Sequence, residues 1–160
     1  MEKNSFIDGI IDGVIVRDLK KFLDERGWLC ELYRHDELYY EIHPQMAYAS
    51  MTNPGITRGP HAHKEQTDIF CFIGPGNFKV VLWDNRSHSE TYMTRQIIFA
   101  GQDSPKMIIV PPGVVHGYKS IGPGPGLVFN APNKLYAGEG KRGPVDEIRY
   151  ENDPNSPFKL

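Results

Sequence analysis

The apolar residues of this chain fall in short runs that alternate with turn-forming residues. Runs rich in β-branched and aromatic residues, each bounded by Gly, Pro or a polar turn, occupy residues 14–16, 28–33, 69–73, 78–83, 91–99, 107–110, 114–118 and 127–129. One segment, residues 18–23, has the pattern of a helix, but it is too short to organise a core. Eight or more short strands predict an all-β fold, either a double-sheet jelly roll or a small barrel.

Composition supports this interpretation. Sixteen glycines and thirteen prolines make up about 18% of the 160 residues, whereas these two types usually contribute roughly 12%. Residues 122–126 alternate Gly with Pro, so we expect a turn there and not a strand. The chain contains no internal repeat and no low-complexity linker, which predicts a single domain over residues 1–160 with a polar tail at residues 141–160.

Charge and cysteine content exclude several classes of protein. A net charge of -2 gives no general attraction to nucleic acid or to anionic membranes. Apolar stretches such as residues 107–110 are far shorter than the roughly 20 residues of a membrane span, and residues 1–5 do not resemble a signal peptide. Cys30 and Cys71 lie in strand-like segments and indicate buried, reduced thiols. We therefore expect a soluble cytoplasmic protein with neither nucleic acid nor membrane as a partner.

Histidines and an acidic residue gather in one stretch of the sequence. His61 and His63 are two residues apart, so on a strand both imidazoles lie on one face, and Asp68 follows after a short turn. A third histidine, His116, comes three residues after the Pro-Pro-Gly turn at residues 111–113. Together they form a three-nitrogen, one-oxygen set that suits Zn, Fe or Mn. A polar pocket without metal is the alternative, and we expect no cofactor, with a divalent metal on these four residues as the second possibility.

These two segments resemble the two cupin motifs. The first motif reads Gly, five residues, His-x-His, three or four residues and an acid, and it is matched with Asp68 in place of the usual Glu. The second reads Pro-x-Gly-x-x-His, and Ser120 stands where Asn is common. The resemblance implies a cupin-type double-stranded β-helix, which is a jelly roll.

Further segments are similar to a narrower family. They occur in the family's order at residues 11–16, 24–32, 58–61, 82–87, 112–118 and 152–154. The chain thus resembles the dTDP-4-dehydrorhamnose 3,5-epimerase family. The resemblance implies an isomerase that epimerises a dTDP-4-keto-6-deoxyhexose next to its 4-keto group, at C3, C5 or both, in deoxysugar and polysaccharide biosynthesis. It also implies a homodimer that exchanges an N-terminal strand.

The resemblance assigns catalytic roles by position. It makes His61 the base that removes the proton next to the ketone, and it makes Asp153 the carboxylate that orients this histidine. The tail at residues 141–160 would then fold back to deliver Asp153; the alternative is a solvated turn residue before Pro154. Tyr136 matches a later tyrosine of the family and is the expected proton donor.

Two positions depart from the family pattern. Asp68 stands where the family has a lysine that stabilises the enolate, and Phe129 stands where it has a tyrosine on a late strand. Tyr136 or Tyr118 is left to replace that tyrosine. A single epimerisation, or binding without turnover, is therefore an alternative to double epimerisation.

The nucleotide-binding positions follow the family more closely. Arg26 and Arg58 match arginines near the diphosphate, whose oxygens suit guanidinium groups. Glu31 matches a residue that contacts the base, and Phe22 is placed to stack near it; for Arg26 and Glu31 the alternative is an exposed turn charge and an edge-strand carboxylate. The expected substrate-binding set is Phe22, Arg26, Glu31, Arg58, His63 and His116.

Three functions follow from these observations. The first is the nucleotide-sugar epimerase described above. The second is a cupin that binds a nucleotide sugar without turning it over, which the residues at positions 68 and 129 favour. The third is a metal-dependent cupin enzyme of another class that uses His61, His63, Asp68 and His116.

Overall fold

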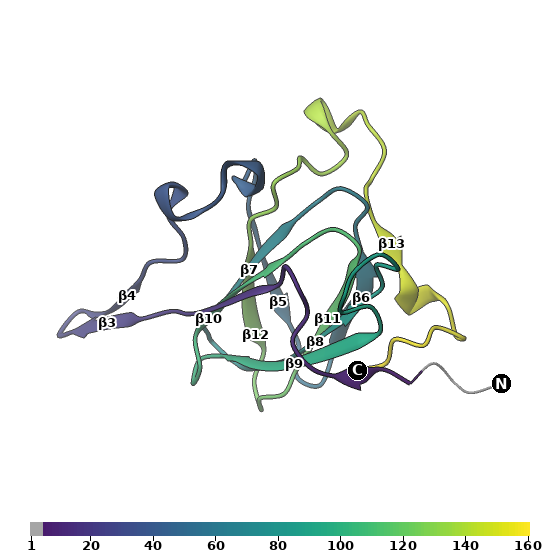
Figure 1. Cartoon of the computed structure of the whole chain (residues 1–160). Helices are drawn as coiled ribbons and strands as arrows, with labels where there is room; N and C mark the ends of the chain where they lie inside the picture. Colours follow the sequence, from purple (N-terminus) through teal and green to yellow (C-terminus); the bar gives the residue numbers. More distant parts are fainter. Residues whose placement is uncertain (1–4) are drawn as a thin grey trace.

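The computed structural model describes residues 5–160, and two β-sheets that face each other make up its body (Figure 1). The first sheet has six strands in the order β1 (Ile7–Asp8), β9 (Thr94–Gly101), β8 (Asn77–Asp84), β11 (Val114–Ser120), β6 (Thr57–Ala62) and β13 (Ile148–Arg149). The second has five, in the order β2 (Ile15–Asp18), β10 (Lys106–Val110), β7 (Asp68–Phe72), β12 (Gly126–Asn130) and β5 (Tyr48–Thr52). The prediction of an all-β jelly roll is confirmed.

Within residues 5–160, helical structure is limited to single turns. Four 3-10 segments occur, at η1 (His35–Glu37), η2 (Tyr40–Ile42), η3 (Glu139–Lys141) and η4 (Tyr150–Asn152). No helix in residues 5–160 is long and apolar enough to cross a membrane.

The core lies between the two sheets, and both sheets also carry apolar residues on their outer faces. On β8, Phe78 and Leu82 point into the core, whereas Trp83 points outward and packs against Phe158 from the tail. On β7, Phe72 is in the core and its neighbours pack on the outer side. Because these strands are buried on both faces, they are continuous apolar runs in the sequence. Burying each of these large side chains stabilises the fold by about 1.5–3 kcal/mol.

The segment that carried a helical pattern is a strand, so that prediction was wrong. Lys21–Asp24 forms β3, which pairs with β4 (Gly27–Cys30) in a hairpin that extends away from the two sheets (Figure 1). Gly27 has a φ of 122°, which a glycine adopts without strain, and the Asp24 carboxylate accepts the backbone N–H of Arg26. The tight turn favours the hairpin. The competing helix would be only six residues long, too short to offset the free-energy cost of its nucleation.

The end of the chain packs on the outer face of the six-stranded sheet. β13 pairs with β6, with Arg149 opposite His61. Phe158 is 4% exposed, and its ring centroid lies 5.6 Å from Trp83 and 4.8 Å from Tyr150. The tail is therefore bound to the strand that carries the first histidine motif.

Candidate active site

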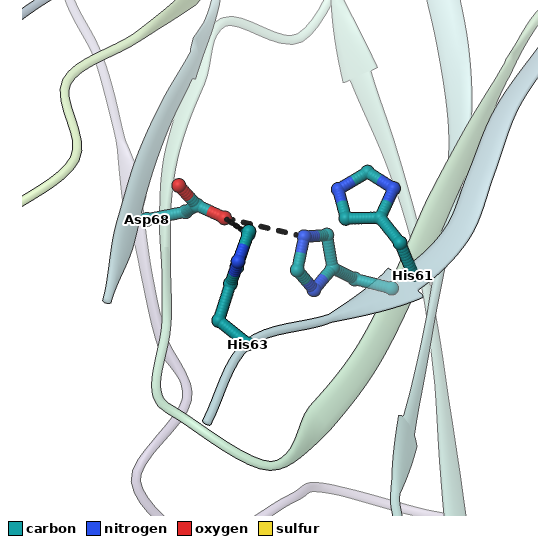
Figure 2. A group of neighbouring side chains, drawn as sticks. His61, His63 and Asp68 are labelled. Carbon is teal, nitrogen blue, oxygen red and sulfur yellow. Dashed lines mark ion pairs between the residues drawn. The ribbon is translucent and has the colours of Figure 1, made fainter. Parts of the chain in front are cut away.

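Three strands bring the histidines and Asp68 together. β6 and β11 are neighbours, with His61 directly opposite His116, and Asp68 begins β7 in the facing sheet. One ligand atom from each of His61, His63, Asp68 and His116 lies within 4.8 Å of the others. Figure 2 shows the Asp68 carboxylate turned toward His63, with the His61 ring on the far side of the group.

Gly59 shapes the strand that carries His61. Its φ of +81° is in the left-handed region, and a Cβ at this position would lie 2.7 Å from the backbone oxygen of His116. The register between β6 and β11 shifts at the same level, between His116 and Tyr118. The irregular pairing at Gly59 thus sets the position of His61 opposite His116.

The Asp68 carboxylate is 1% exposed, and its two oxygens have different partners. Oδ1 accepts hydrogen bonds from the amides of Gln66 and Asn130, each at 3.0 Å. Oδ2 lies 2.9 Å from Nε2 of His63 and 3.3 Å from Nε2 of His116. Burial by itself raises the pKa of Asp68, but the close contacts with the His116 and His63 imidazoles outweigh burial and hold this pKa well below its usual range. The carboxylate is therefore ionised.

Two of the imidazoles are held through their Nδ1 atoms by backbone carbonyls. Nδ1 of His116 lies 3.0 Å from the carbonyl oxygen of Val114, and Nδ1 of His63 contacts the carbonyl oxygen of Asp146. A carbonyl oxygen only accepts, so each Nδ1 carries the hydrogen, and the Nε2 atoms face Asp68. In residues 5–160, neither His116 Nε2 nor Asp68 Oδ2 makes a hydrogen bond of normal geometry, although both are fully buried. Imidazoles fixed in this way, with converging nitrogen and carboxylate atoms, fit a divalent metal.

Asp146 connects the tail to the loop after β6. Its carboxylate accepts the backbone N–H groups of Lys64, Glu65 and Gln66 at 2.8 to 3.0 Å. Its carbonyl oxygen fixes His63, as described above. For His63, burial lowers the pKa, but the adjacent Asp68 carboxylate outweighs burial and raises it. The Asp68 carboxylate thus favours the protonated form of His63.

His61 differs from the other two histidines because its ring makes no hydrogen bond to any residue in 5–160. Burial and, to a lesser extent, the nearby rings of His116 and His63 lower its pKa to about 2, and the Asp68 charge does not offset them. Its ring centroid lies 4.4 Å from that of His116, at an interplanar angle of 70°. His61 is therefore a neutral imidazole with a free lone pair.

A cavity of about 560 Å³ opens beside His61. Its walls come from both sheets and from the tail: Tyr48 and Ser50 on β5, Arg58 and His61 on β6, and residues 144–147 of the tail. This volume lies within the range of small-molecule sites. Because His61 lines it, the cavity is the candidate active site.

Arg58 lies at the edge of this cavity in a fixed position. Its Nε donates to Thr52 Oγ1 and its Nη2 donates to the Met51 carbonyl, both at 2.9 Å. The cavity thus contains one of the two arginines that the sequence predicted near a diphosphate.

The predicted residues on the projecting hairpin do not reach this cavity within one chain. Phe22 and Arg26 lie on the hairpin, and Arg26 pairs with Asp24. Glu31 follows the hairpin, and its Oε2 lies 3.9 Å from Nη1 of Arg34. None of the three predicted residues lines the cavity formed by residues 5–160.

Of the two predicted residues from the late part of the chain, one lines the cavity and one does not. Tyr136 is a cavity residue. Asp153 does not line the cavity, and its carboxylate accepts the N–H of Asn155. The nearest carboxylate to His61 in the described cluster is Asp68. The pairing of Asp153 with His61 stays a prediction.

The alignment of the late strand needs a correction by one residue. Phe129 points away from the cavity and packs on the outer face of the five-stranded sheet, against the apolar cluster that includes Cys71 and Met107. Asn130, the next residue, is the one that points inward. Directly opposite it on β5 lies Tyr48, whose hydroxyl accepts a hydrogen bond from Asn130 Nδ2 at 2.9 Å.

Sequence reasoning missed Tyr48. The signal was the segment Tyr48–Thr52, in which Tyr48, Ser50 and Thr52 alternate with Ala49 and Met51. Only the pairing with β12 shows that the polar set faces inward.

Comparisons with known proteins agree on one family. The sequence model of the dTDP-4-dehydrorhamnose 3,5-epimerase family matches residues 9–146. The chain is 39% identical over 150 residues to the probable low-salt glycan biosynthesis epimerase Agl13 of Haloferax volcanii, covering 91% of this chain and 96% of that protein.

Solved structures share the fold. A dTDP sugar isomerase from Desulfovibrio desulfuricans G20 superimposes with a TM-score of 0.80 at 24% identity, over 93% of this chain and 91% of that one. NovW of Streptomyces spheroides, a 4-keto-6-deoxy sugar epimerase, superimposes with a TM-score of 0.77 at 20% identity, over 97% and 78% of the two chains.

Proposed function

Because this chain belongs to the dTDP-4-dehydrorhamnose 3,5-epimerase family and is a sugar-nucleotide isomerase, we propose that it epimerises a dTDP-4-keto-6-deoxyhexose at a carbon next to the ketone. The product would serve deoxysugar or glycan biosynthesis. The ketone acidifies the protons on both neighbouring carbons, so the enzyme must supply a base for one face of the sugar and a proton donor for the other.

The state of His61 is the observation that carries this proposal. A base must have a free lone pair directed at open space, and His61 is neutral, lines the cavity and makes no hydrogen bond to residues 5–160. The other two histidines are held between backbone carbonyls and Asp68. His61 therefore removes the proton in this proposal, while His63, Asp68 and His116 form the floor beneath it.

The projecting hairpin supports a homodimer as part of the same proposal. An isolated two-stranded hairpin is marginally stable in water, and this one exposes Phe22, Leu23, Trp28 and Leu29. A second copy would cover these side chains. Arg26 does not line the cavity of its own chain, and in a dimer it would reach the cavity of the second copy. The diphosphate would then lie between Arg58 of one copy and Arg26 of the other.

The proposed compartment is the cytoplasm. Cys30 and Cys71 are both free thiols, and Cys71 is buried. Unpaired cysteines are typical of proteins in a reducing compartment.

Isotope exchange tests the proposed reaction. Proton NMR of dTDP-4-keto-6-deoxyglucose in D2O with the protein should show loss of the C3 or C5 signal, and His61→Asn should abolish that loss. A known epimerase serves as the active control. No exchange at either carbon, with the control active, would reject the function for this substrate. Calorimetric binding of the sugar nucleotide without exchange would instead support the non-catalytic binding protein.

A second candidate function rests on the convergence of buried atoms at Asp68. Nε2 of His63, Nε2 of His116 and Oδ2 of Asp68 would hold a divalent metal, with His61 as a fourth ligand, and a bound metal would act as a Lewis acid toward a carbonyl oxygen. The two candidates differ on His61, because a metal ligand has no lone pair left for a proton. Elemental analysis of untagged protein decides between them: about one metal per chain supports the second, and a content far below one rejects it.

A further inference from the structure

From the position of its hydroxyl, we infer that Tyr48 is the proton donor on the sugar face opposite His61. The inference rests on the proposed epimerase function. Inversion at a carbon needs two groups on opposite sides of the ring, since a base that returns its own proton restores the original configuration. His61 belongs to β6 in the six-stranded sheet and Tyr48 to β5 in the facing sheet, and both line the same cavity.

The hydrogen bond that Tyr48 makes leaves its proton available. Asn130 Nδ2 donates to the Tyr48 oxygen at 2.9 Å, so the hydroxyl acts as an acceptor in this contact. A phenol that accepts one hydrogen bond still has its own O–H to donate. Asn130 is itself buried and bonded to Asp68, which fixes the direction of the amide. The O–H of Tyr48 is thus anchored at the oxygen and free at the hydrogen.

The hydroxyl also stays protonated at neutral pH. Although the side chain as a whole is half exposed, burial around the hydroxyl raises the pKa of Tyr48 to about 12. Tyr48 therefore meets the enolate as an acid.

The other two tyrosines of the cavity are placed less well for this role. Tyr118 is 5% exposed, its ring packs edge-on against Phe70, Phe72 and Phe78, and its oxygen lies 3.3 Å from Ser50 Oγ. Tyr136 is 55% exposed, and its hydroxyl has no hydrogen-bond partner in residues 5–160. Tyr118 is anchored but buried and Tyr136 is exposed but not anchored, whereas Tyr48 has both an anchored oxygen and an exposed side chain.

The proton balance closes over one inversion. The C–H bond next to the ketone breaks, its proton goes to His61, and the electron pair forms the enolate. The enolate carbon then takes the hydroxyl proton of Tyr48 on the other face, which leaves a phenolate and an imidazolium. Proton exchange with water returns both to their starting states.

The variant Tyr48→Phe separates proton removal from inversion. With dTDP-4-keto-6-deoxyglucose in D2O, wild-type protein should exchange and invert together. In Tyr48→Phe, deuterium should still enter at the wild-type rate to within about tenfold, because His61 is intact, while the epimerised product should form at least about 100-fold more slowly. Tyr92→Phe, an exposed tyrosine on the turn before β9, is the matched control and should behave as wild type.

The outcomes are distinct. Normal inversion by Tyr48→Phe, or loss of inversion in Tyr136→Phe with Tyr48→Phe unaffected, overturns the assignment and leaves the epimerase function standing. No exchange by wild-type protein rejects the function itself. If thermal melting shows that Tyr48→Phe does not fold, difluorotyrosine at position 48 tests the same hydroxyl: its lower phenol pKa should move the alkaline limb of inversion, but not of exchange, to lower pH. An unmoved limb overturns the assignment.

Discussion

Two buried carboxylates stand at strand ends of this jelly roll, and they differ in how their charge is met. Asp84, at the end of β8, is 0% exposed and accepts hydrogen bonds from the Arg86 guanidinium at 2.8 and 2.9 Å, from Ser89 at 2.7 Å and from Thr91 at 2.6 Å. Asp68, at the start of β7, has amide donors on one oxygen only, and its other oxygen faces two imidazoles without a hydrogen bond of normal geometry.

The comparison separates a structural group from a functional one. A permanent cation and two hydroxyls give Asp84 a complete set of donors, which ties the turn after β8 to the sheet. The imidazoles around Asp68 change charge with pH, bind metals, and lie beside a cavity. Buried carboxylates of the second kind are typical of sites that do chemistry.

The largest expected effect is the loss of activity in His61→Asn. Removing the base should slow isotope exchange by at least about 1,000-fold, equivalent to about 4 kcal/mol of barrier, while the melting temperature stays close to that of wild type. His88→Asn is the matched control, since His88 is an exposed histidine on the turn that follows Asp84. If exchange fell by a similar factor in His88→Asn, the site around Asp68 would not differ in function from the turn after Asp84.

The next effect is on stability, in Asp84→Asn. Uncharged Asn leaves the Arg86 guanidinium without its partner and loses acceptor capacity for Ser89 and Thr91, so we expect a loss of about 3 kcal/mol in the free energy of unfolding. Urea denaturation measures it. Exchange by the folded fraction should stay at the wild-type rate, and an unchanged unfolding midpoint would contradict a structural role for Asp84.

The opposite result is expected for Asp68→Asn. The side-chain oxygen of Asn keeps the contacts with Gln66 and Asn130, and His63 can release its proton, so the stability loss should be smaller than in Asp84→Asn, about 1–2 kcal/mol. Loss of the negative charge between His63 and His116 should still reduce exchange by about 10- to 100-fold, because these rings support His61. Melting and exchange are measured on the same sample, and a large stability loss with intact exchange would reverse the assignment.

The smallest effect is the acid sensitivity that Asp84 confers. Burial raises its pKa, but the bonds from Arg86, Ser89 and Thr91 outweigh burial and hold this pKa well below the usual range. A lowered folded-state pKa means that the stabilisation is present above the unfolded value near 4 and is lost as pH falls toward the folded value. Between pH 4 and pH 3 wild type should lose about 1 kcal/mol more than Asp84→Asn. Parallel pH profiles of the unfolding free energy would contradict this.

The sequence predicted the fold and the approach of four site residues because both depend on local signals. Turn residues bound each strand, and the spacing of His61 and His63 fixes the face on which both lie. Tyr48 was missed because Ala49, Ser50 and Met51 give a weak strand signal, and its inward direction depends on pairing with β12. A shift of one residue exchanges the two faces of a strand, so Asn130 and not Phe129 points inward, toward Asp68 and Tyr48.

The hairpin and the tail illustrate longer-range limits. The pattern of residues 18–23 by itself indicates a helix, but pairing with β4 makes Lys21–Asp24 a strand. The place of Asp153 depends on the single turn η4, whose direction is set by packing of the tail on the outer face of the sheet. Neither is encoded in the nearby residues alone.

The contact between Asp146 and His63 has a consequence for the growing polypeptide. The carbonyl that selects the tautomer of His63 lies 83 residues later in the chain. The same late residue holds the backbone of Lys64, Glu65 and Gln66. While the ribosome has made the strands as far as β12 but not yet residue 146, the histidine loop lacks the group that orders it. The order of synthesis therefore places completion of the active site after strands β1 to β12, so that chains ended before residue 146 carry the histidines without their final arrangement.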